Sequence, residues 1–121
     1  MIVFNKKILI FILLLISSIT CFAYSQKCVP DSVIFNDILG CYINEYNKYD
    51  KELNELYAYK ISKLSKIKKN KLKNSQREWI KLKESICVAD EKNYGRESHF
   101  DAMQCQIDMT KERILFLEKY N

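Results

Sequence analysis

Five cysteines and one histidine are the residues of this chain with the most specific chemistry. Thiols can carry out redox reactions, bind a metal ion or pair as disulfides, and their spacing helps to separate these uses. No Cys-x-x-Cys pair is present, so a thioredoxin-like redox centre has no support. Structural zinc sites combine closely spaced cysteine and histidine ligands, whereas His99 stands alone. We therefore expect no metal ion and no cofactor.

The N-terminal segment indicates the compartment in which these cysteines reside. Two lysines precede an apolar stretch over residues 8–16, and Ala23 stands at a plausible cleavage point. This pattern is typical of a secretory signal peptide, and it is too short and wrongly flanked for a stable membrane span. We expect residues 1–23 to be removed. This leaves one periplasmic or secreted domain over residues 24–121, with no membrane span.

Cys21 is the one cysteine that falls within this expected leader. A lipidated cysteine would follow a leucine and small residues, whereas Cys21 follows Ser18, Ile19 and Thr20. Lipoprotein anchoring through Cys21 is therefore disfavoured. The exported domain keeps four cysteines, and in an oxidising compartment these predict two disulfides. A domain of this size buries a modest core, so such cross-links would contribute much of its stability.

The segment after the first of these cysteines carries apolar residues at three- and four-residue steps, the period of a helix with one apolar face. Pro30 is followed by Asp31 and Ser32, and either of these two side chains can cap a helix start. The pattern predicts one helix over residues 32–64, which would be ~50 Å long. The expected apolar stripe contains Ile34, Ile38, Tyr42, Tyr46, Tyr49, Leu53, Leu56 and Leu64.

Two further helices are expected. Ser65 is a suitable cap for the second, and Gly95 separates it from a third that Ser98 can cap. No stretch has the two-residue alternation of a strand. Short turns make neighbouring helices antiparallel, so we expect an all-α fold, a small antiparallel three-helix bundle with a long first helix. The second helix presents Leu72, Gln76, Trp79, Lys83 and Ile86 on one face, and the third presents Phe100, Met103, Ile107, Ile114 and Leu117.

This arrangement brings the cysteines near one another in the bundle. Counted from the turns, Cys41, Cys87 and Cys105 fall at about the same level, and Cys28 lies just before the first helix. We favour the sequence-local pairs Cys28–Cys41 and Cys87–Cys105. The pairs Cys41–Cys87 and Cys28–Cys105 remain an alternative, because all four thiols are near one another in this arrangement. Each bridge would stabilise the domain by ~2–4 kcal/mol.

Charge is distributed unevenly along the chain. From Lys60 to Lys83 there are ten basic residues and one acid, whereas the rest of residues 24–121 has eight basic and fourteen acidic residues. The bundle would therefore be basic at the first turn and acidic at the other end. Such runs are often only solvated surface, although each end can also attract a partner of opposite charge. The candidate partner contacts are Glu97 and Asp101 at the acidic end, and Lys66, Lys68, Lys69 and Lys71 at the basic tip.

The order of these features resembles that of a known family. After Cys28 and Cys41 come DKELNELY at residues 50–57, SQREWIKLKESIC at residues 75–87, Gly95, Cys105, TKER at residues 110–113 and Leu117. In this order and spacing, essentially all of residues 24–121 resembles the exported domain named for the lysozyme inhibitor LprI. Three positions depart from the pattern: Lys83 stands in place of Arg, Glu84 in place of Asp, and Arg96 in place of Gly. Lysine lacks the planar fork of arginine, which puts bidentate pairing at position 83 in doubt.

The resemblance implies a helical framework built on a defined set of residues. Its matching positions include Asp50, Leu53, Asn54, Tyr57, Gln76, Trp79, Lys83, Thr110, Arg113 and Leu117. A lone tryptophan on the packed face of a helix buries a large apolar area, so we expect Trp79 to belong to the core. We expect Lys83 to pair with Asp50 or Glu52 of the first helix, and Arg113 to do the same from the third. Such pairs position helices more than they stabilise them.

The resemblance also implies an activity, inhibition of lysozyme. From the residues themselves, no Ser/His/Asp or Cys/His set remains once the cysteines are paired, so we expect no catalytic residues and no enzyme. Two functions stay open. The domain inhibits a lysozyme-type muramidase by occlusion, or it is a structural or binding module of the cell envelope with another protein as its partner. Nucleic acid is not an expected partner, because export removes the chain from the cytoplasm.

Overall fold

The computed structural model describes residues 27–121. The expected signal peptide at residues 1–23, including Cys21, lies outside the described residues. The described chain forms α2 (Phe35–Lys63), α3 (Lys66–Ile86), α4 (Glu91–Tyr94) and α5 (Ser98–Lys119), with no strand among residues 27–121. The predicted all-α class with three long helices is confirmed, and α4 is a short helix that the sequence did not predict.

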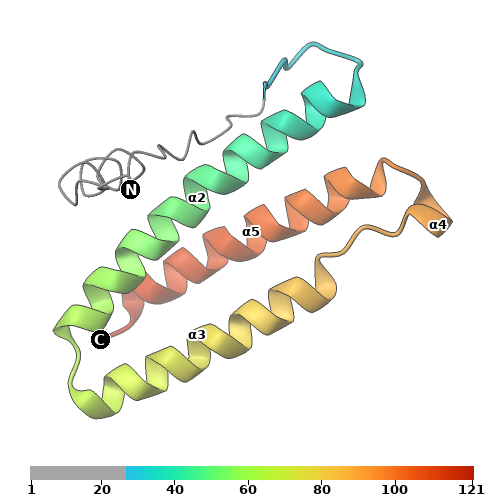
Figure 1. Ribbon diagram of the computed structural model, residues 1–121. Helices are drawn as coiled ribbons and strands as arrows, with labels where there is room; N and C mark the ends of the chain where they lie inside the picture. The colour runs from blue at the N-terminus through green and yellow to red at the C-terminus, as the bar shows by residue number, and fades with distance from the viewer. Residues whose placement is uncertain (1–26) are drawn as a thin grey trace, which may run out of the picture.

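The three long helices form the expected antiparallel bundle. α2 and α5 run side by side in the same direction, and α3 runs in the opposite direction (Figure 1). At one end, the ring of Phe35 in α2 lies 4.9 Å from the ring of Phe100 in α5. At the other end, Lys60 Nζ donates hydrogen bonds of 2.9 Å to the backbone oxygens of both Glu118 and Tyr120. A cation at the end of α5 complements the exposed carbonyl groups of that helix terminus.

The apolar core lies in the half of the bundle nearer the turn between α2 and α3. Leu53 of α2, Leu72 of α3, and Ile114 and Leu117 of α5 form one buried cluster. Tyr49, Leu56, Tyr57, Ile61, Leu64, Trp79 and Tyr120 pack around it. The helical period therefore turns one apolar face of each helix toward a shared centre, as predicted.

The helix starts differ from the prediction in detail. α2 begins at Phe35, three residues later than expected, and Ile34 is its N-cap without a side-chain bond. Ser32 Oγ instead accepts from the Ile34 backbone nitrogen at 3.0 Å and donates to Asp37 at 2.9 Å. An N-cap lies directly before the first helical residue, so Ser32 is too early in the chain to cap α2. Its bonds instead stabilise the turn that leads into the helix. Ser65 is the N-cap residue of α3, as predicted, but its side chain makes no capping bond.

The turn into α5 also differs from expectation. Glu97 is the N-cap, and Ser98 is the first helical residue, whose Oγ donates to the Gly95 backbone oxygen at 2.7 Å. Gly95 has φ of 72°, the left-handed region that glycine adopts without strain, so it ends α4 as a helix-breaking residue. Asp90 begins α4 by accepting a hydrogen bond from the Asn93 backbone nitrogen at 3.2 Å.

Two residues of the predicted apolar faces are mainly exposed. Ile34 is 60% exposed because it precedes α2, and Ile86 is 55% exposed because it is the last residue of α3. Cys87 takes the buried position beside Ile86, with 4% of its surface exposed. Both exceptions therefore lie where a helix begins or ends. At such positions the helical period no longer fixes the direction of the side chain.

Both disulfides have the sequence-local pairing that we favoured. Cys28–Cys41 joins the extended segment before α2 to that helix, and Cys87–Cys105 joins the end of α3 to α5. The alternative pairing is therefore excluded. Both bridges lie at the end of the bundle away from the turn between α2 and α3 (Figure 1). Two disulfides fit an extracellular or periplasmic domain, because such bonds persist in oxidising compartments.

Candidate functional site

Two basic side chains are buried where the three long helices meet. Lys83 of α3 has 6% of its surface exposed, and Arg113 of α5 has 8%. They lie against the rings of Tyr46, Trp79 and Phe116. We call these five residues the cation–aromatic layer. No ion pair within residues 27–121 includes either cation.

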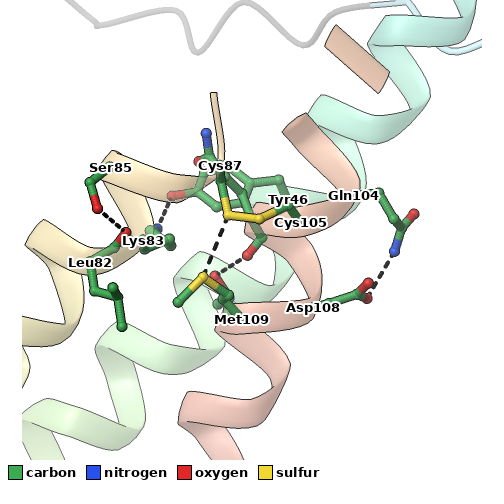
Figure 2. Close-up of a disulfide and its surroundings, with 11 residues drawn as sticks. Tyr46, Leu82, Lys83, Ser85, Cys87, Gln104, Cys105, Asp108 and Met109 are labelled. Atoms are coloured by element: carbon green, nitrogen blue, oxygen red, sulfur yellow. Dashed lines mark hydrogen bonds between the residues drawn. A yellow bond between two sulfur atoms is a disulfide. The ribbon is translucent and has the colours of Figure 1, made fainter. Parts of the chain in front are cut away.

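Lys83 is held by a hydroxyl group and two rings. Its Nζ donates to Tyr46 Oη at 2.8 Å, and it lies 4.8 Å from the Tyr46 ring centre and 5.0 Å from the Trp79 ring centre. Tyr46 Oη in turn donates to Asp50 Oδ1 over a long 3.5 Å. The predicted direct pairing with Asp50 or Glu52 is therefore wrong. Tyr46 lies one turn before Asp50 on α2, and its longer side chain reaches Lys83 before the carboxylate does. Figure 2 shows Lys83 and Tyr46 close to the Cys87–Cys105 disulfide.

Arg113 binds neutral oxygens on α3. Its Nε donates to Gln76 Oε1 and its Nη2 donates to Ser75 Oγ, each at 2.9 Å. Its guanidinium carbon lies 4.2 Å from the Phe116 ring centre and 5.6 Å from that of Trp79. The predicted pairing with an acid of α2 is wrong here too, because the side chain reaches α3. Burial lowers the pKa of Arg113, since desolvation disfavours the charged form.

Trp79 links these two cations to the apolar core. Its ring lies near both Lys83 and Arg113, and the half-buried side chain packs against the buried leucines. A tryptophan face attracts cations and its apolar area favours burial, so one side chain serves both contacts.

The remaining residues of the sequence pattern surround this layer. Leu53 and Leu117 belong to the buried core, and Tyr57 packs against it. Asn54 is exposed and its Nδ2 donates to Asp50 Oδ2 at 3.0 Å. Thr110 is fully buried, and its Oγ1 donates to the Gln106 backbone oxygen at 2.7 Å. Most of the pattern thus contributes to the packing of the three helices, whereas Asn54 lies on the surface.

Sequence reasoning missed several members of this arrangement. Tyr46 was expected only as an apolar stripe residue, although its hydroxyl contacts both Lys83 and Asp50. The four-residue step from Tyr46 to Asp50 was a usable signal, because such residues lie on one face of a helix. The three-residue step from Arg113 to Phe116 on α5 was a similar signal. Ser75 carried none, since its contact with Arg113 depends on how α5 packs against α3.

The acidic end is defined by Asp31, Asp37, Glu45, Glu91, Glu97 and Asp101. Half of these carboxylates have partners: Asp37 accepts from Ser32, Glu45 accepts from Lys111 Nζ at 3.0 Å, and Glu91 lies 2.5 Å from His99 Nε2. The hydrogen bond that Lys111 donates to Glu45 raises the pKa of Lys111. The exposed Asp31, Glu97 and Asp101 take part in no ion pair within residues 27–121.

The basic tip is the turn between α2 and α3 together with the start of α3. We define it by Lys63, Lys66, Lys68, Lys69, Lys71 and Lys73. Lys69 is half-buried and the others are exposed. The two sets of predicted contacts, Glu97 with Asp101 and the lysines from Lys66 to Lys71, therefore lie at opposite ends of the bundle (Figure 1).

Residues 27–121 hold neither a free thiol nor a cluster of metal ligands. All four cysteines of residues 27–121 are in disulfides, so none of them presents a thiolate. In the same range, no three His, Cys, Asp or Glu side chains are placed to hold a metal ion. None of the described helices combines the length and the apolar character that crossing a membrane would require.

Comparison with known proteins adds one match. No curated protein and no solved structure matches the chain significantly. A family model described as "Lysozyme inhibitor LprI" matches residues 32–117. This range includes the cation–aromatic layer and three of the four bridged cysteines. The chain therefore belongs to the LprI lysozyme inhibitor family.

Proposed function

We propose that this chain is an exported, non-catalytic domain that binds a lysozyme-type muramidase and inhibits it by occlusion. The observation that carries the proposal is the family match over residues 32–117. The two disulfides support it, because inhibition outside the cytoplasm requires a domain that stays folded in an oxidising compartment. As part of this proposal, cleavage after Ala23 releases residues 24–121 into the periplasm or the medium.

The framework favours inhibition by binding alone. Two covalent cross-links limit the conformations that the bundle loses on docking, and among residues 27–121 no buried side-chain nitrogen or oxygen lacks a hydrogen-bond partner. Such a preorganised framework favours tight association. In the proposed complex the bundle lies across the entrance of the catalytic cleft and excludes the polysaccharide. No bond is made or broken by the inhibitor.

The acidic end is the surface that we propose for the first contact. Lysozymes are commonly cationic, and Asp31, Glu97 and Asp101 are exposed carboxylates without an ion pair among the described residues. Opposite charges on the two partners accelerate the encounter and orient it. This steering weakens as the screening length falls below ~10 Å, so inhibition should weaken with added salt.

An inhibition assay tests the proposal directly. The exported, oxidised protein is purified, its intact mass is measured, and it is added in molar excess to several lysozymes that are degrading cell-wall particles. We expect at least one enzyme to lose its muramidase activity. The same enzyme should keep its activity when the inhibitor has been reduced and alkylated beforehand. If the oxidised protein leaves every enzyme fully active, the inhibitor proposal fails, and the envelope-module alternative takes its place. A mass that includes residues 1–23 would contradict the proposed cleavage.

A further inference from the structure

The basic tip has more positive charge than the fold uses. Lys60 has a structural task, because it binds the backbone oxygens at the end of α5. Lys63, Lys66, Lys68 and Lys71 are exposed, and no ion pair within residues 27–121 includes them. Like charges held this close repel one another, so they reduce the stability of the folded state. A surface that carries this cost without internal compensation is suited to a polyanionic partner.

Exposed apolar side chains lie among these lysines. Ile67 is 71% exposed and stands between Lys66 and Lys68 in the first turn of α3. Tyr59 is 59% exposed in the last turns of α2, with Lys63 Nζ 5.8 Å from its ring centre. Lysines around an exposed aliphatic residue and a tyrosine form the combination that binds at the headgroup layer of an anionic membrane. The lysines contact the phosphates, and the apolar groups enter the boundary with the acyl chains.

The shape of the tip favours a flat partner over a cleft. It consists of the ends of two antiparallel helices beside the end of α5, so it is ~20 Å across, since each helix with its side chains is ~10 Å wide. A catalytic cleft that admits one polysaccharide chain is narrower than this surface. Lys73 lines a pocket between α2 and α3, whereas Lys66, Lys68 and Lys71 are exposed at the very start of α3. Exposed lysines at the end of a bundle suit contact with a planar sheet of charge.

We propose that the basic tip docks on an anionic lipid surface, with Ile67 entering the headgroup layer. This inference goes beyond the proposed inhibition and does not depend on it. Because the acidic end is at the opposite end of the bundle (Figure 1), the docked domain would present Glu97 and Asp101 away from the lipid. Membrane attachment would then hold the inhibitor at the cell surface, where a cell-wall hydrolase acts.

Vesicle binding tests this proposal. The exported, oxidised protein is mixed with vesicles of phosphatidylcholine alone or with about one-third phosphatidylglycerol, and the bound fraction is measured by sedimentation. Its intact mass is checked first, because a retained apolar leader would bind lipid by itself. We expect binding only to the anionic vesicles, and loss of that binding in high salt. Equal binding to both vesicle types, or none to anionic vesicles at low salt, would overturn the proposal.

Matched variants locate the contact. Replacing Lys66, Lys68, Lys69 and Lys71 by Gln should reduce partitioning by at least ~25-fold. This assumes about five-fold for each lysine that touches the surface, with two or more touching at once. The control replaces Lys48, Lys51, Lys81 and Lys92 by Gln, which changes the net charge equally but spares the tip. An equal loss in the control would mean that only total charge matters, and would overturn the assignment to the tip.

A second pair of variants does not alter charge. Ile67→Gln should weaken binding to anionic vesicles several-fold, whereas Val33→Gln, at a site 95% exposed near the other end, should not. Both side chains are already in solvent, so neither change should prevent folding. Unchanged vesicle binding in Ile67→Gln would remove the apolar part of the proposal. The variant with Lys66, Lys68, Lys69 and Lys71 replaced by Gln could also keep its vesicle binding and lose its inhibition of lysozyme. That result would assign the tip to the enzyme and overturn the lipid proposal.

Discussion

The two ends of the bundle are held together by different means. At the acidic end, two disulfides join the segment before α2 to that helix and join α3 to α5, and a group of aromatic rings packs beside them. At the basic tip, the buried cluster of Leu53, Leu72, Ile114 and Leu117 lies close by, and Lys60 binds the end of α5. The cation–aromatic layer lies between these two regions.

The difference shows where a small domain needs covalent support. The side with the buried leucines can rely on apolar burial, at ~25 cal/mol per Å² removed from water. The other side buries few large apolar residues, so its helices depend on the sulfur bridges. The lysines of the basic tip repel one another, and this repulsion is better tolerated beside the buried leucines than at the end that depends on the disulfides.

Removing the bridge between α3 and α5 should have the largest effect. Cys87→Ser with Cys105→Ser should lower the free energy of unfolding by roughly 3–5 kcal/mol, because α3 loses its tie to α5 where the apolar core is thin. Cys28→Ser with Cys41→Ser should cost less than half of this, since the freed segment over residues 27–34 can fray while the bundle stays folded. Denaturant unfolding measures both. Equal losses would contradict the proposed difference between the two bridges.

Truncating Trp79 should have the second-largest effect on stability. Trp79→Ala should lower the free energy of unfolding by about 3 kcal/mol, because the core loses a half-buried ring and both buried cations lose an aromatic face. Trp79→Phe, which keeps a ring, should recover more than half of the loss. A melting curve unchanged in Trp79→Ala, with partner binding lost, would move Trp79 from the core to the interface.

At the basic tip, the helix-end contact should have a smaller effect. Lys60→Met keeps most of the aliphatic stem but removes both bonds to the end of α5, which should cost about 1 kcal/mol. Lys63→Met is the matched control, because Lys63 is exposed and makes no such bond. We expect it to leave the free energy of unfolding unchanged or slightly raised, since it removes repulsion. Thermal unfolding of the two variants should therefore separate them, and equal destabilisation would contradict the assigned role of Lys60.

Removing the exposed ion pair between Glu45 of α2 and Lys111 of α5 should have the smallest effect, and this effect should be visible mainly in the titration of Lys111. The hydrogen bond that Lys111 donates to Glu45 raises the pKa of Lys111, so the folded state binds this proton more tightly than the unfolded state. Any stability from the pair is present at neutral pH and is lost as the pH rises through the folded-state pKa. In Glu45→Gln, NMR titration should give a lower pKa for Lys111 than in the unmodified protein. An identical pKa would show that the pair does not persist in solution.

The helices and the disulfides could be predicted from the sequence, and the polar contacts could not. The apolar period, Ser65 and Gly95 marked the elements, and the short separation within each cysteine pair favoured the observed bridges. The partners of Lys83 and Arg113 were predicted wrongly, because charge alone suggested a carboxylate. The actual partners depend on how far Tyr46 reaches across from α2 and on how α5 faces α3, and neither property is local in sequence.

The most direct test of the central proposal measures how fast the oxidised protein associates with an inhibited lysozyme. Glu97→Lys with Asp101→Lys should slow association about ten-fold and reduce its salt dependence, because the steering charges are reversed. Glu52→Lys with Glu112→Lys, an equal change of charge on exposed residues away from that end, should have a much weaker effect. Replacing Lys66, Lys68, Lys69 and Lys71 by Gln should not slow association. Slowed association in this lysine variant, with no change in the Glu97 and Asp101 variant, would contradict the account and place the enzyme at the basic tip.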